Sequence, residues 1–227
     1  LRDLLTEGLR HAGKPDPSDG RYPFLKMARR MPVARLRDYR HFFADPEAYA
    51  INAIVRDPYA RAVSAWRDKF LDGHNATPEG ADAGYPRSMR QGELAKMRAH
   101  ARARGLPGAE PGTLVPFATF VDSIEAGTPG RRNTHWEEQR RVILFDTLPY
   151  TGTWRMEDGL GEPLAQAFAP LGIDPDWVRE KADTPRNASS KGASVLDEDL
   201  GQRLQQIYAR DFEAFGYDPE GWRQMLR

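Results

Sequence analysis

The sequence predicts an α/β fold in one domain over residues 1–227, with a mostly parallel central sheet flanked by helices. Short apolar runs rich in β-branched residues alternate with segments whose apolar residues recur at helical spacing. One of these runs leads directly into a well-marked helix start. A chain of 227 residues, 40% of them apolar, is also large enough to bury a core without metal or disulfide staples.

The composition excludes several functional classes. With no cysteine, the sequence offers no disulfide scaffold, no cysteine-based metal site and no cysteine nucleophile. The 33 basic residues balance 33 acidic ones, whereas a general nucleic-acid binder shows a basic excess. No apolar run approaches the roughly 18–20 residues that a membrane span needs, and these residues show no signal-peptide pattern. We expect a cytoplasmic protein, and its arginine-rich composition suggests a bacterial origin.

The first elements follow from apolar spacing. A helix is predicted over residues 1–12, where four leucines recur at helical spacing before Gly13. Residues 24–46 are predicted to be mainly helical. The run 49–55 is short, apolar and β-branched, which is typical of a buried strand.

A helix start follows that strand at once. Asp57 is a good N-cap, and Pro58 suits the first helical position. From Tyr59 to Phe70, apolar residues step by four, three and four, which makes one helix face. The stretch 49–70 therefore predicts strand, tight turn and helix, one half of a βαβ unit.

This junction has the chemistry of an anion site. Open α/β sheets bind ligands where a strand ends and a helix begins, because the first N–H groups and the helix dipole favour negative charge. Arg56 adds a bidentate cationic donor, and Ser64, two turns into the helix, could add a hydroxyl. The same residues could instead form only a helix cap with a local ion pair, and spacing alone leaves both readings open.

The remaining elements follow the same rules. In chain order they are a loop over 71–92, a basic helix over 93–104, a short amphipathic helix from Phe117 to Gly127, strands at 142–145 and 150–154, a helix over 163–171, and a long C-terminal helix from Leu200 to Phe215 that ends at Gly216.

Residues 55–70, Val-Arg-Asp-Pro-Tyr-Ala-Arg-Ala-Val-Ser-Ala-Trp-Arg-Asp-Lys-Phe, resemble the 3′-phosphate-binding motif of the sulfotransferases, in particular the Golgi-type carbohydrate sulfotransferases and their bacterial relatives. Four weaker likenesses extend the resemblance over about 45–217, and the first is the helix with Phe117 and Phe120, which is similar to the family's segment after its variable loop. Residues 133–139 resemble the family's His-Trp-x-x-Gln motif, and 150–158 resemble a strand that usually reads Gly-x-Tyr/Phe-Glu. Residues 211–217 match its closing Asp-Phe-x-x-Phe-Gly-Tyr.

The resemblance implies a P-loop-like sulfotransferase fold and an enzyme that transfers a sulfuryl group. The donor would be 3′-phosphoadenosine 5′-phosphosulfate, the acceptor a hydroxyl of a carbohydrate or a similar molecule, and no metal would be needed. By position in the motif, Arg56 and Ser64 should bind the 3′-phosphate. The family's nucleotide-closing loop resembles residues 184–192, and Trp154 stands where an aromatic residue often lies near the adenine. The cationic and hydroxyl candidates in that loop are Arg186, Ser190 and Lys191. That loop could instead be a plain surface loop, and Trp154 a core residue.

A general base is needed to take the acceptor's proton. Histidine suits this role near neutral pH, and His135 is our first candidate because it lies in the family-like His-Trp pair. His41 is the alternative because it precedes the strand that leads into Arg56. Glu137 and Glu138 could serve instead, and His135 could simply hold its loop.

Residues 71–113 are predicted to be a variable, acceptor-facing insertion. They are locally basic, which would suit a polyanionic glycan, although the same charges could form only a solvated helix. The predicted acceptor-binding residues are Arg87, Arg90 and Arg98, with Lys96, Arg102 and Arg104 nearby.

One family motif does not occur in this sequence: the 5′-phosphosulfate loop, a strand followed by Pro-Lys-x-x-x-Thr/Ser. Lys14 and Pro15 stand in the reverse order. We expect the loop upstream of Leu1. Two alternatives to an active sulfotransferase stay open, a nucleotide-binding remnant of the same fold and a P-loop kinase relative that uses ATP.

Overall fold

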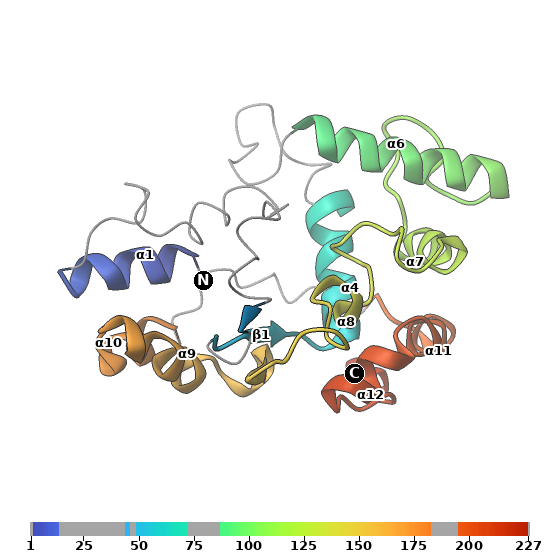
Figure 1. Ribbon diagram of the computed structural model, residues 1–227. Coiled ribbons are helices and arrows are strands. Elements are labelled where there is room, and N and C mark those ends of the chain that lie inside the picture. Colours follow the sequence, from blue (N-terminus) through green and yellow to red (C-terminus); the bar gives the residue numbers. More distant parts are fainter. Residues whose placement is uncertain (1, 14–43, 46–48, 72–86, 183–194, 227) are drawn as a thin grey trace. The chain divides into compact units, whose positions relative to one another are not determined.

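A computed structural model describes residues 2–13, 44–45, 49–71, 87–182 and 195–226 (Figure 1). The chain divides into two compact units, each assembled from two separate stretches of sequence. The first unit comprises Leu1–Val55 and Thr147–Ala188, and the second comprises Arg56–Asp146 and Ser189–Arg227.

The first unit contains a small parallel sheet. Strands β1 (Asn52–Val55) and β2 (Gly152–Arg155) pair in parallel, so that Ile54 lies opposite Trp154. This pairing confirms two of the three predicted strands, those at 49–55 and 150–154, and their parallel direction. It agrees with a sulfotransferase fold and with the mixed helix and sheet architecture that the sequence predicts.

The described part of the first unit also contains helices. They are α1 (Arg2–His11), α9 (Gly161–Phe168) and α10 (Pro175–Ala182), with short 3₁₀ turns η4 (Met156–Asp158) and η5 (Ala169–Leu171). Leu9, Phe168, Ile173 and Val178 form the centre of the core. A side chain at Gly8 would meet Ile173 at 3.0 Å, so the glycine permits α1 to approach closely. The predicted helices at 1–12 and 163–171 are confirmed, whereas α10 was not anticipated.

The described part of the second unit is helical. Its elements are α4 (Pro58–Trp66), which continues as the π-helical turn η3 (Arg67–Leu71), α6 (Arg87–Arg104), α7 (Phe117–Ala126), α8 (Gln139–Val142), α11 (Glu198–Ile207), α12 (Ala209–Phe215) and α13 (Trp222–Met225). As predicted, the Asp57 side chain caps α4 by accepting a hydrogen bond from the N–H of Ala60 at 2.8 Å, and Pro58 opens the helix.

Aromatic side chains fill the core of the second unit. Phe120 lies 5.5 Å from Phe70 and 5.4 Å from Trp136, measured between ring centroids. Trp66 and Phe117 meet edge to face at 5.4 Å. These pairs hold α4, η3 and α7 together with the loop that carries Trp136.

The predicted strand at 142–145 is wrong. This stretch is the end of α8 and a following turn, in which the N–H of Phe145 bonds to the carbonyl of Arg140. Leu144 has a positive φ of 56° and is 54% exposed. The turn starts because the buried Asp211 carboxylate accepts the N–H groups of Gln139 and Arg140. These partners are more than 70 residues apart in the sequence, so the apolar run at 142–145 gives no sign of the contact.

The predicted C-terminal helix is broken at Tyr208, where α11 ends and α12 follows. Tyr208 is buried, and its hydroxyl donates a hydrogen bond to the Trp136 carbonyl. The break between the helices therefore lies at a residue with a tertiary contact. The helix ends at Gly216 with φ 64°, as predicted. The predicted loop at 71–92 ends earlier than expected, because α6 begins at Arg87. Most of the predicted helix at 24–46 lies outside the described residues.

Candidate functional site

Arg56 directly follows β1, and its main chain is bracketed by one side chain. The N–H of Arg56 donates to Gln139 Oε1 at 2.9 Å, and Gln139 Nε2 donates to the Arg56 carbonyl at 2.7 Å. Both peptide groups that flank the Arg56 Cα are therefore fixed, and its side chain leaves the backbone in a defined direction. Arg56 itself is half-buried. The start of α4, with Asp57 as its cap, comes next in the chain.

A second arginine of the same motif has a structural role. The Arg61 guanidinium donates to the carbonyl oxygens of Glu137 at 2.6 Å and Thr134 at 2.7 Å. Burial lowers the pKa of Arg61, while Tyr208 and Asp211 oppose that shift. Arg61 thus ties α4 to the loop that carries His135.

That loop is also braced from within. Glu137 is buried, and its carboxylate accepts hydrogen bonds from the N–H groups of Gly130, Arg132 and Glu138 at 2.6, 3.2 and 3.0 Å. Glu138 is buried too and pairs with Arg141. Both carboxylates therefore stabilise local structure.

His135 is the exposed neighbour of a buried anchor. Trp136 lies in the aromatic core, while His135 is exposed, and its N–H bonds to Asn133 Oδ1 at 3.0 Å. Partial desolvation lowers the pKa of the His135 imidazole, and the ammonium of the buried Lys69 lowers it further. An imidazole that stays neutral at physiological pH is able to accept a proton.

Of the other predicted donor-binding residues, only Ser64 and Trp154 belong to the described part of the chain. Ser64 is half-buried on α4, one helical turn beyond Arg61, and positions three apart share a helix face. Trp154 lies in β2 of the first unit and is half-buried. The residues His41, Arg186, Ser190 and Lys191 lie outside the described part of the chain.

The predicted acceptor cations fall on α6. Arg87 and Arg90 lie in its first turn, but their side chains are not among those described. Arg98 is half-buried and donates to the Thr113 carbonyl at 3.3 Å. Its neighbours also have internal partners, since Arg102 bonds the Ala109 carbonyl and Arg104 bonds Asp122.

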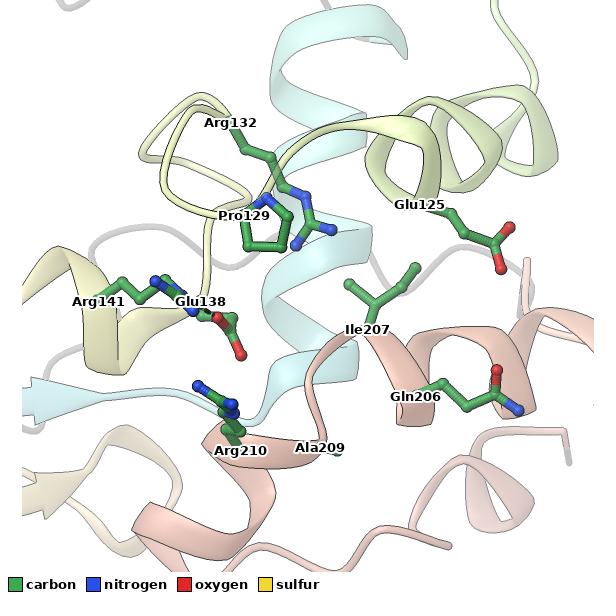
Figure 2. A pocket seen from close by; sticks show the side chains of 9 residues that line it. All are labelled: Glu125, Pro129, Arg132, Glu138, Arg141, Gln206, Ile207, Ala209 and Arg210. Atoms are coloured by element: carbon green, nitrogen blue, oxygen red, sulfur yellow. Dashed lines mark hydrogen bonds and ion pairs between the residues drawn. The ribbon is translucent and has the colours of Figure 1, made fainter.

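A pocket of about 450 Å³ lies elsewhere in the second unit. Figure 2 shows the side chains of Arg132, Glu138 and Arg210 pointing toward it from the loop after α7, from the start of α8 and from α12. Glu138, an alternative base, lines it, but none of the described residues predicted to bind donor or acceptor does. The pocket therefore adds nothing to the arrangement around Arg56.

Sequence reasoning recognised the motifs that contain Gln139 and Asp211 but gave these residues no role. The side chain of Asp211 is completely buried and accepts the N–H groups of Gln139 at 2.7 Å and Arg140 at 3.0 Å. A carboxylate and an amide at fixed places in a motif could have signalled such roles. The partners, however, are 72 and 83 residues away.

Two properties of the described residues bear on function. No cluster of three or more His, Asp or Glu side chains there could hold a metal ion. None of the helices described is both long enough and apolar enough to cross a bilayer.

Comparison with known proteins gives concordant matches. The model of a family described as "Sulfotransferase family" matches residues 16–218. Carbohydrate sulfotransferase 12 of Mus musculus is 25% identical over 210 residues, which cover 85% of this chain and 43% of that protein. Carbohydrate sulfotransferase 12 of Xenopus laevis is 26% identical over 200 residues, with the same coverage of 85% and 43%. The chain thus spans less than half the length of these curated relatives. No solved structure matches the chain significantly.

Proposed function

Because the chain belongs to the sulfotransferase family, we propose that it transfers a sulfuryl group from 3′-phosphoadenosine 5′-phosphosulfate to a hydroxyl of a carbohydrate or a similar acceptor. The observation that carries the proposal is the fixed main chain of Arg56 at the start of α4. An arginine whose main chain is fixed just before a helix N-terminus suits a phosphate group of the donor.

In this proposal each candidate residue has the role that its position in the family's motifs implies. Arg56 binds the 3′-phosphate through its guanidinium, and Ser64 donates its hydroxyl to the same group. Trp154 offers a flat apolar face to the adenine. Arg186, Ser190 and Lys191 lie in the sequence segment that resembles the family's nucleotide-closing loop, and they would add cationic and hydroxyl groups to the site.

The transfer itself needs positioning and charge stabilisation more than covalent chemistry. The acceptor oxygen forms a bond to sulfur as the bond between sulfur and the 5′-phosphate oxygen breaks. His135 takes the acceptor's proton, and 3′-phosphoadenosine 5′-phosphate leaves with the negative charge. The lowered pKa of His135 supports this role because the imidazole is neutral before the reaction.

The acceptor proposal rests on two weaker supports. The names of the two curated relatives describe them as carbohydrate sulfotransferases. In addition, the basic helix α6, with Arg87, Arg90 and Arg98, would attract an anionic glycan by long-range electrostatics.

Nucleotide binding tests the proposal directly. In the full-length protein, 3′-phosphoadenosine 5′-phosphate should raise the melting temperature, because a ligand that binds only the folded state stabilises it. Arg56→Ala should remove most of that increase, whereas Arg131→Ala, at an exposed arginine, should leave it intact. Absence of any increase in the wild-type protein would overturn the proposal. Binding without sulfuryl transfer to any acceptor would indicate a non-catalytic remnant.

A further inference from the structure

We propose that Gln139 and Asp211 are positioning residues of the 3′-phosphate site, and that they act through the main chain of Arg56. The inference rests on the proposed function, since it concerns the nucleotide assigned above. Neither residue touches the nucleotide. Their effect is to set the direction in which the Arg56 side chain leaves the backbone.

The first step joins Gln139 to Arg56. A primary amide offers one acceptor and one donor side by side, and both are used on the same residue, at 2.9 Å to the Arg56 N–H and 2.7 Å to its carbonyl. Bonds to both groups restrict φ and ψ of Arg56 together. A long, flexible arginine side chain then begins from a fixed origin, which lowers the entropy lost when it binds phosphate.

The second step joins Gln139 to Asp211. The main-chain N–H of Gln139 donates to Asp211 Oδ2 at 2.7 Å, and the adjacent N–H of Arg140 donates to Oδ1 at 3.0 Å. Asp211 has no exposed surface. Burial raises its pKa, whereas these two N–H donors favour the charged carboxylate. Asp211 therefore anchors the first turn of α8, from which the Gln139 side chain reaches Arg56.

The loop that carries His135 does not depend on the two hydrogen bonds between Gln139 and Arg56. Arg61 holds the carbonyls of Thr134 and Glu137, and the Glu137 carboxylate holds three N–H groups of the loop. Loss of the Gln139 amide should therefore affect the orientation of Arg56 more than the folding of the loop. This separation makes the role testable.

The Gln139→Glu substitution makes the two side-chain hydrogen bonds to the Arg56 main chain depend on pH. Ionised, the glutamate can accept the Arg56 N–H, but its second oxygen repels the Arg56 carbonyl. Protonated, it offers a donor and an acceptor like the native amide. Burial and the nearby carboxylates of Asp211 and Glu138 favour protonation, while Arg56 and Arg61 oppose it.

The experiment measures the affinity for 3′-phosphoadenosine 5′-phosphate by calorimetry at pH 7.5 and pH 5.5, with wild-type protein as reference at each pH. Gln139→Glu should bind the nucleotide about tenfold more weakly than wild type at pH 7.5, because a tenfold loss corresponds to about one hydrogen bond. At pH 5.5 its affinity should approach that of wild type. Gln139→Leu should bind weakly at both pH values. Gln206→Glu, at an exposed position on α11, should match wild type throughout.

The outcomes separate this inference from the proposed function. If the wild-type protein binds no nucleotide, the proposed function fails and the positioning role fails with it. If wild type binds and Gln139→Glu binds equally well at pH 7.5, only the positioning role is overturned. The positioning role is also overturned if Gln139→Glu lowers the melting temperature but its nucleotide affinity, relative to wild type, is the same at pH 7.5 and pH 5.5. Asp211→Asn, which can accept only one of the two N–H groups, should also weaken binding.

Discussion

The guanidinium of Arg61 donates a 2.6 Å hydrogen bond to the main-chain carbonyl of Glu137, 76 residues further along the chain. With the second bond to Thr134, it fastens the loop that carries His135 onto helix α4. Arg61, to which the sequence analysis gave no role, thus holds the loop of the predicted general base in place.

Arg61→Leu should destabilise the protein by about 3 kcal/mol, because two charge-assisted hydrogen bonds are lost and two carbonyls stay without their donor. Urea unfolding measures the change. Arg131→Leu, at an exposed arginine of the same loop, should change stability by less than about 0.5 kcal/mol. Equal effects of the two substitutions would contradict the role given to Arg61.

Two glycines should respond to alanine in opposite directions. A Cβ at Gly201, in α11, would meet the Trp222 ring at 2.5 Å, so Gly201→Ala should cost about 1–3 kcal/mol by overpacking. Gly92 lies in α6 and a Cβ there would meet nothing within 4 Å, so Gly92→Ala should gain about 0.5–1 kcal/mol. Thermal or urea unfolding distinguishes the two signs, and a stabilising Gly201→Ala would show that Trp222 lies elsewhere.

The account of His135 predicts a particular pH profile. As a base, His135 must be neutral, so activity should fall when the pH drops through its folded-state pKa, which lies below the ordinary imidazole value of 6.5. Removing the Lys69 cation in Lys69→Met should move this acid limb of kcat/KM to higher pH. His135→Gln should abolish transfer and keep nucleotide affinity. A limb unchanged by both substitutions would point to another base.

The charges of α6 predict an effect on the acceptor alone. Arg98→Ala should raise KM for a polyanionic acceptor roughly two- to fivefold and leave the KM of a neutral acceptor nearly unchanged. The difference should shrink at high salt. Arg223→Ala, on α13, is the matched control. A change in nucleotide affinity in Arg98→Ala would argue against an acceptor role.

Local sequence signals predicted the segment from β1 to α4 well. The strand, the Asp57 cap and Pro58 at the helix start depend only on neighbours, and the structure confirms all three. The strand predicted at 150–154 is also confirmed, although the sequence did not show which strand it would pair with. Local signals failed where a side chain distant in the sequence determines the backbone conformation. The run 142–145 has the composition of a strand, but Asp211 starts a helical turn just before it.

The candidate site shows the same division. Arg56 and Ser64 could be chosen from the sequence because their motif is continuous, whereas the bond from Gln139 to Arg56 joins residues 83 positions apart. Arg61 and Tyr208 are further examples, since each contacts a carbonyl oxygen of the His135 loop more than 70 residues away. A single sequence gives no signal for contacts to main-chain atoms at that distance.

The central claim is sulfuryl transfer, and one assay tests it most directly. The full-length protein is incubated with 3′-phosphoadenosine 5′-phosphosulfate carrying labelled sulfur and a panel of glycan, lipid and phenolic acceptors, with EDTA present. The account predicts label in a carbohydrate or similar hydroxyl acceptor, undiminished by EDTA and lost in Arg56→Ala. No transfer to any acceptor, or transfer only of phosphate from ATP when Mg²⁺ is supplied, would contradict it.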